Sequence, residues 1–192
     1  MTQTTLLTSH KGVDLHAATA VRVMQHRLAG GDALRALHRC ELHTWWNGAG
    51  GQAVADLLGI GRYYNPNKHH YGHFELDRGA DWRRDAAPGG GALDVAWPGR
   101  AIASDLEPLG ENLLTALLGG PVPSGCVAAD VASFPLGEPG ALLSGVVWRL
   151  WLADDGRDPA RLADRLAVTR SGAQGLLVNP HLHGWRVAIR RP

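Results

Sequence analysis

Cysteine is scarce in this chain, with Cys40 and Cys126 the two examples among 192 residues. Two distant cysteines are too few for a disulfide framework or a cysteine-type zinc site. No segment approaches the roughly 20 consecutive apolar residues that span a bilayer. The first residues, MTQTTLLTSHKG, also lack the charged and apolar regions of a signal peptide. These absences predict a cytoplasmic protein with no membrane partner.

An excess of charge is absent as well, since 19 Lys and Arg residues are balanced by 18 Asp and Glu residues. The two signs are interspersed, and no basic stripe is present that would release counterions from a nucleic acid backbone. Nucleic acid is therefore a disfavoured partner. The length and the 45% hydrophobic content suit one globular domain over residues 1–192.

Hydrophobic periodicity and turn residues predict the elements of the first third of the chain. Asp14 is placed to cap a helix whose apolar residues recur at helical spacing. Alternating polarity then predicts a strand before the Gly-rich turn at residues 47–51. The expected elements are a helix over 14–29, a strand over 37–46, a helix over 52–59, a strand reaching Asn65-Pro66 and a strand over 69–76.

The middle of the chain is expected to be an insertion. It begins with a loop over 77–91, and Pro98 and Gly99 then mark the turn of a predicted hairpin. A helix is expected over 107–118 from its leucine spacing. The Gly- and Pro-rich residues 119–140 predict a long surface loop. The chain then returns to regular structure from Leu142, with expected strands over 145–155, 175–180 and 181–189 and a helix over 159–169.

Two segments of the sequence match in order. Residues 55–62 align with 163–170, Asn65-Pro66 aligns with Asn179-Pro180, and ELHTWW occupies the same place as VVWRLWL. With two extra residues in the first copy, His69-His70-Tyr71-Gly72 aligns with His181-Leu182-His183-Gly184. This order predicts a first repeat over 33–77, a middle insertion over 78–141 and a second repeat over 142–190.

The predicted fold class follows from that duplication. Each copy has a helix between strands, which favours two β-α-β units related by a pseudo-twofold axis. The expected class is α+β with internally duplicated, ferredoxin-like units, in which a mainly antiparallel sheet is covered by helices on one face.

Histidines after the two Asn-Pro corners are the strongest candidates for chemistry. Strand alternation places His69, His73 and Glu75 on an outward face, and His181 and His183 on the face of Trp185. Imidazole and carboxylate groups can hold zinc or another divalent transition metal. The candidate metal ligands are therefore His69, His73, Glu75, His181 and His183, provided that the two corners approach each other. The alternative is that the imidazoles cap the corners or lie on a wet sheet face.

Four further residues are candidate ligand-binding groups because they occupy matching positions: Asn65, Arg62, Asn179 and Arg170. The arginines could bind an anion, or could interact with the helix ends that precede them. The asparagines could bind a ligand, or could close their own turns through the side-chain oxygen. Both alternatives remain open for each pair.

Two functions are consistent with these patterns. In the first, the chain is a binding or accessory protein that engages a partner protein or forms a homo-oligomer, with Trp45, Trp46, Trp82 and Trp97 as possible exposed rings. In the second, it is a metal- or histidine-dependent enzyme that acts on a small anionic metabolite at the junction of the repeats. The first is favoured because no complete catalytic set is visible.

Overall fold

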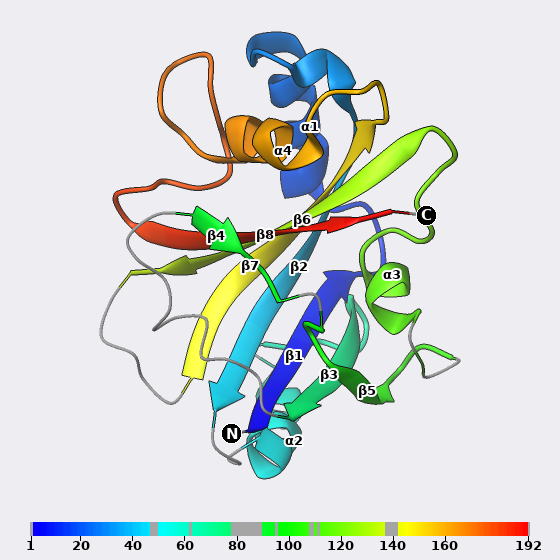
Figure 1. Ribbon diagram of the computed structural model, residues 1–192. Helices are drawn as coiled ribbons and strands as arrows, with labels where there is room; N and C mark the ends of the chain where they lie inside the picture. The colour runs from blue at the N-terminus through cyan, green and yellow to red at the C-terminus, as the bar shows by residue number, and fades with distance from the viewer. Residues whose placement is uncertain are drawn as a thin grey trace.

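Eight strands form one sheet, in the order β4-β8-β6-β7-β2-β1-β3-β5 (Figure 1). This computed structural model describes residues 2–46, 50–61, 63–77, 90–94, 96–107, 110, 112–136 and 142–191. The strands are β1 (Thr2–His10), β2 (Leu34–Trp46), β3 (His69–Asp77), β4 (Gly90–Ala92), β5 (Arg100–Ser104), β6 (Cys126–Pro135), β7 (Leu142–Ala153) and β8 (His183–Arg190). The helices are α1 (Leu15–Arg27), a 3₁₀ turn (Gly31–Ala33), α2 (Gly50–Ile60), α3 (Leu113–Leu117) and α4 (Pro159–Ala167).

Helices cover both faces of this sheet. Successive residues of a strand point to opposite faces, so Leu6 of β1 packs in the cluster that contains α2, and Leu7 packs in the cluster that contains α3. Helices α1 and α4 lie together over the β6–β7–β2 region, on the face to which Leu37 and Leu150 point (Figure 1). The opposite face carries Cys40, the four leucines of the α3 region and the buried Trp97. Both faces are therefore hydrophobic interfaces.

The ferredoxin-like duplicated class predicted from the sequence is wrong. The chain forms one large mixed sheet, in which β4 pairs parallel to β8 and the other neighbouring pairs are antiparallel. Helices lie on both faces, whereas the prediction places them on one. The predicted β-α-β units are also wrong. Strand β3 pairs with β1 and β8 pairs with β6, and neither β1 nor β6 belongs to a predicted unit. The single-domain organisation stays a prediction.

Strand β1 lies in the first ten residues, for which the sequence predicts no helix or strand. It is the third strand from the β5 edge of the sheet, between β2 and β3, and its residues from Gln3 to Ser9 are buried. Four threonines supply most of its polarity, and threonine favours strands because it is β-branched. The Thr5 hydroxyl is satisfied by the Thr44 hydroxyl of β2 at 3.1 Å. The polar composition of this segment therefore did not indicate a buried strand.

Strand β6 replaces most of the surface loop predicted for residues 119–140. It lies between β7 and β8, and every residue from Cys126 to Phe134 is buried. Its small side chains, such as Ala129 on one face and Ala132 on the other, fit under the helices and loops that cover both faces. Alanine has low strand propensity, so this segment forms a strand because of its long-range pairing and its burial.

Three shorter predictions are also wrong. The expected hairpin around Pro98 does not form, because β5 pairs with β3 and β4 pairs with β8. No strand precedes either Asn-Pro corner in residues 63–65 or 174–178. The described helix α3 is also shorter than the predicted helix over 107–118.

The remaining predicted helices and strands are confirmed. Asp14 caps α1 by accepting hydrogen bonds from the backbone N–H groups of His16 at 2.9 Å and Ala17 at 3.2 Å. Helix α4 begins with Pro159, and Asp158 caps it in the same way. In the part of the chain that the structure describes, no helix has the length and apolar character needed to cross a membrane.

Candidate functional site

The five predicted metal ligands lie towards opposite sides of the sheet. His69, His73 and Glu75 are on β3, whereas His183 begins β8 and His181 precedes it. Four strands separate β3 from β8, which corresponds to about 24 Å at the usual strand spacing. The two corners therefore do not meet. Within the described ranges, no group of three or more His, Cys, Asp or Glu side chains is placed to hold a metal ion.

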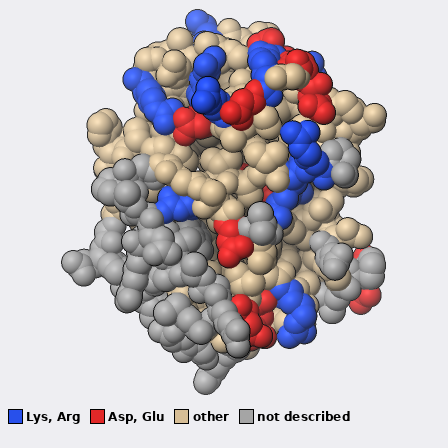
Figure 2. Space-filling view, viewed as in Figure 1, with Lys and Arg blue, Asp and Glu red and all other residues tan. Residues whose placement is uncertain are grey.

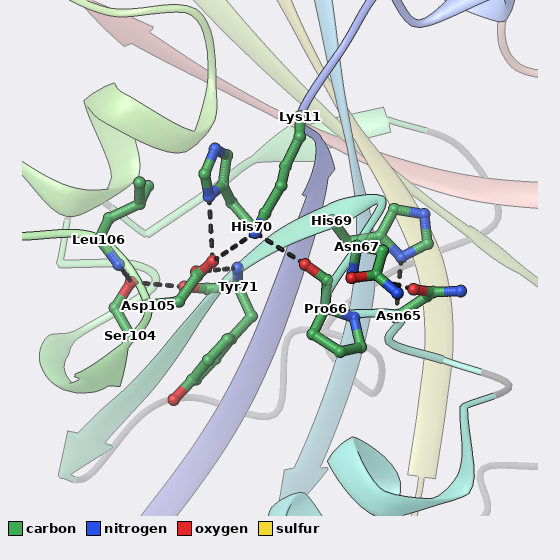
Figure 3. Close-up of polar contacts among 10 residues, drawn as sticks. All are labelled: Lys11, Asn65, Pro66, Asn67, His69, His70, Tyr71, Ser104, Asp105 and Leu106. Carbon is green, nitrogen blue, oxygen red and sulfur yellow. Dashed lines mark hydrogen bonds and ion pairs between the residues drawn. The ribbon is translucent and has the colours of Figure 1, made fainter.

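The β3 candidates have local partners instead. The ring Nδ1 atom of His69 accepts a hydrogen bond from the backbone N–H of Asn65 at 3.3 Å, as Figure 3 shows. Glu75 lies 3.5 Å from Arg100 of β5 in an exposed ion pair. His73 is buried, and burial lowers its pKa. The predicted outward exposure of His73 is wrong because that face of the sheet is also covered.

The two Asn-Pro corners have the same internal hydrogen bonds. The Asn65 side-chain oxygen accepts from the Asn67 N–H at 2.9 Å, and the Asn179 side-chain oxygen accepts from the His181 N–H at 3.0 Å. The two corners therefore align without a gap, so that Asn67 corresponds to His181. The sequence alignment, which places two extra residues in the first copy, is wrong at this point. Both asparagine side chains close turns. Their role in ligand binding stays a prediction.

We expect Asn65→Ala to lower the free energy of unfolding by about 0.5–1.5 kcal/mol, the net value of one hydrogen bond. The variant Asn67→Ala is the matched control, because Asn67 contributes its backbone N–H to this turn. Urea unfolding measures both effects. Equal stability of Asn65→Ala and Asn67→Ala would contradict a structural role for the Asn65 side chain.

Arg170 and Arg62 were the predicted anion ligands. The Arg170 guanidinium binds the Asp164 carboxylate at 2.7 Å and lies 5.9 Å from the ring centroid of Trp185. It also lines an open groove of about 710 Å³ between α4, β8 and β4. Its role as a ligand-binding residue stays a prediction. Arg62 lies outside the described residues.

Three of the four tryptophans that the sequence suggested as exposed rings are not part of a surface patch. Trp45, Trp46 and Trp97 are all buried, and Trp82 lies outside the described residues. Their rings fill the space between the sheet and its covering segments.

A buried charge cluster, missed from the sequence, lies on the sheet face that α3 covers. Asp130 of β6 and Arg149 of β7 are 0% and 2% exposed and stand directly opposite each other. Arg149 binds the carboxylate with two hydrogen bonds, of 2.6 Å from Nε and 2.9 Å from Nη2. Arg190 of β8 donates from Nε to the same carboxylate at 3.4 Å. One buried negative charge therefore faces two guanidinium groups.

The two arginines of this cluster line a pocket of about 330 Å³, which we call the arginine pocket. Its walls come from α3, the segment after it and the end of β8. The lining residues are Asn112, Leu114, Thr115, Pro121, Val122, Arg149, Arg190 and Arg191. Figure 2 shows basic side chains gathered near the end of β8, where Figure 1 places α3 close to the C-terminus. No carboxylate is among the described lining residues, so the pocket is electropositive.

A second hollow, which we call the histidine cleft, lies on the other side of α3 and the turn after it. It also has a volume of about 330 Å³, and its polar lining residues are Ser9, His10, Asp14, His38, Arg39 and His70. The His70 Nδ1 atom lies 3.0 Å from the Asp105 carboxylate, which Lys11 approaches at 3.5 Å (Figure 3). Asp105 also accepts from the Tyr71 N–H at 2.8 Å. These contacts orient the His70 ring at the cleft.

Hydrogen bonding also sets the protonation state of Asp105. Partial burial raises the pKa of its carboxyl group, but the Tyr71 N–H and the His70 side chain lower it further. The net result is a pKa below the ordinary aspartate value, so this carboxylate is charged at neutral pH.

The sequence contains one signal that could have found the charge cluster. Asp130 is the one charged residue in CVAADVASF, and Arg149 is the one charged residue in VVWRLWL. Single opposite charges within two apolar segments suggest a buried ion pair, because an isolated buried charge is very costly. That inference requires residues 126–134 to be recognised as a strand.

A scan against protein-family models and searches of curated proteins and of solved structures found no match to this chain.

Proposed function

We propose that this protein is a binding protein for a small anion, which it holds in the arginine pocket. The observation that carries the proposal is the gathering of guanidinium groups among the described residues that line that pocket. Arg149, Arg190 and Arg191 all line it, and no described lining residue is a carboxylate. An anion in the pocket would interact favourably with these guanidinium groups.

The chemistry of the lining indicates the ligand class. Guanidinium groups match carboxylate and phosphate oxygens with paired hydrogen bonds, and they are the usual choice for buried anion recognition. Asn112 and Thr115 add neutral side chains that can donate a hydrogen bond. Leu114, Pro121 and Val122 supply apolar walls. The pocket is near the lower size limit of small-molecule sites, which favours a compact organic acid or phosphate compound.

This proposal keeps part of each function predicted from the sequence. It retains the binding role of the first and the small anionic ligand of the second. A protein partner or homo-oligomer, and a cytoplasmic location, stay predictions from the sequence. The enzymatic alternative, with its site at the junction of the two repeats, also stays a prediction, although four strands of the sheet separate β3 from β8.

Arg191 offers the most direct test, because it lines the pocket and is exposed. We expect sulfate and succinate to bind the wild-type protein, and Arg191→Gln to weaken both about fivefold, or roughly 1 kcal/mol, since water screens this side chain. Isothermal titration calorimetry measures the affinities. Arg161→Gln is the control, because Arg161 is an exposed arginine of α4.

Unchanged anion affinity in Arg191→Gln, or an equal loss in Arg161→Gln, would show that binding occurs elsewhere. Failure of the wild-type protein to bind either anion at low ionic strength would reject the proposed function. Preference for sulfate or for succinate assigns the pocket to tetrahedral anions or to carboxylates.

A further inference from the structure

We propose that the arginine pocket takes up a proton together with its anion, and that His38 is the group that receives the proton. This inference rests on the proposed function. It assigns to His38, on the side of the histidine cleft, a regulatory role in the neighbouring arginine pocket.

The sheet places His38 beside the arginine pocket. His38 of β2 pairs directly with Arg149 of β7, and Arg149 pairs directly with Asp130 of β6. Side chains of directly opposed residues lie on the same face with Cβ atoms about 5 Å apart. The row His38–Arg149–Asp130 therefore runs across three adjacent strands. His38 is the titratable residue at one end of this row. The Arg149 guanidinium, which faces the proposed anion, is at the centre of the row.

The surroundings of His38 disfavour its charged form in the free protein. Its ring centroid lies 4.5 Å from that of Trp151, and the backbone of Gly119 packs against the ring. The ring Nε2 atom is buried, with no hydrogen-bond partner among the described residues. Burial and then the positive charge of Arg149 both lower the pKa of His38. We therefore expect a neutral imidazole at pH 7.

Other charged or titratable groups near His38 come from several elements that line the histidine cleft. The Cys40 thiol lies on the same face of β2, and burial raises its pKa, so it stays neutral. Arg39 binds Asp14 at the start of α1 at 3.5 Å and also binds Glu41. The remaining groups that face the histidine cleft are His10 and His70. An anion in the arginine pocket therefore acts on His38 most directly by offsetting the positive charge of Arg149.

The sign of the coupling follows from Coulomb attraction. A bound anion offsets the positive potential of Arg149, so the pKa of His38 is higher in the complex than in the free protein. Anion affinity is then greatest below the free-protein pKa, and the extra affinity is lost as the pH rises through the pKa of the complex. Each unit of difference between the two pKa values corresponds to about a tenfold change in affinity.

The two hollows give the proton and the anion separate approaches. His38 and Gly119 line the histidine cleft, whereas Arg149 and Thr115 line the arginine pocket. Helix α3 and the turn after it separate the two. A proton can therefore reach the imidazole from the histidine cleft while the anion occupies the other side.

Calorimetry with sulfate tests this coupling, because sulfate does not titrate between pH 5 and pH 8. Titrations at pH 6 in two buffers with different ionisation enthalpies measure the protons taken up per anion. We expect the wild-type protein to take up a fraction of a proton and to bind sulfate about three- to tenfold more tightly at pH 5.5 than at pH 8. His38→Gln should bind sulfate with neither effect. His10→Gln and His70→Gln are controls that should retain both.

Sulfate binding by the wild-type protein with no proton uptake and no pH dependence would overturn the coupling and leave the proposed function intact. Retention of both effects in His38→Gln would overturn the assignment to His38. Absence of sulfate binding at every pH would overturn both proposals. If His38→Gln does not fold, NMR titration of the wild-type imidazoles decides the matter: the pKa of His38 must rise when sulfate is added, and an unchanged pKa refutes the coupling.

Discussion

Asp130→Ala is expected to lower the free energy of unfolding by about 3–5 kcal/mol, which is the usual cost of leaving a buried charge without its partner. The substitution removes the carboxylate that Arg149 binds through two hydrogen bonds inside the sheet. Arg190 loses an ion-pair partner as well. Urea unfolding measures the loss through the transition midpoint, provided that the slope is unchanged.

Two further variants separate the buried charge from simple loss of packing. Arg149→Met should cost less than Asp130→Ala, because Asp130 then keeps Arg190 as a partner. Combining Asp130→Ala with Arg149→Met should recover much of the stability, since paired removal leaves no uncompensated charge at this position. Glu75→Gln is an exposed-pair control and should change the midpoint little. A double variant less stable than Asp130→Ala would contradict the electrostatic explanation.

Gly119→Ala is expected to lower the free energy of unfolding by about 2–4 kcal/mol, from backbone strain and steric overlap together. Gly119 has a φ of +92°, a conformation that alanine rarely adopts. An added Cβ would also lie within about 2.5 Å of three atoms of the His38 ring. The ring cannot easily move away, because Trp151 packs near it. Thermal or urea unfolding checks the loss.

The adjacent residue provides a matched control. Gly120 has a similar φ of +95°, but an added Cβ there would meet no atom within 4 Å. Gly120→Ala should therefore show the backbone cost alone, about 1–2 kcal/mol. The difference between the two variants isolates the contact with His38. Equal losses would mean that the His38 ring does not pack against Gly119 in solution.

Local sequence signals were sufficient for several elements of the fold. The Asp14 cap and the apolar spacing after it predicted α1, and Pro159 marked the start of α4. Alternating polarity predicted β2 correctly in residues 37–46. Each of these signals acts between residues close together in the chain, where capping geometry and side-chain periodicity are decisive.

The strands that escaped prediction depend on distant neighbours. Thr4, Thr5 and Thr8 of β1 and the alanines of β6 become buried because each strand lies between two others and both faces of the sheet are covered. Without β6, the Asp130–Arg149 pair and the arginine pocket could not be recognised. The separation of the candidate histidines has the same origin, since the order of strands in the sheet, which local patterns do not encode, decides how far β3 lies from β8.

The sequence by itself determined the helix caps, the Asn-Pro turns and the apolar character of β7, because these arise from interactions within a few residues. The tertiary structure alone decided which strands are neighbours, and hence which charges meet. Pairing of β6 with β7 brings Asp130 to Arg149, and pairing of β2 with β7 adds His38 to the same row. The candidate site is a property of that strand order, because a buried charge can be stabilised only by the groups that the sheet places beside it.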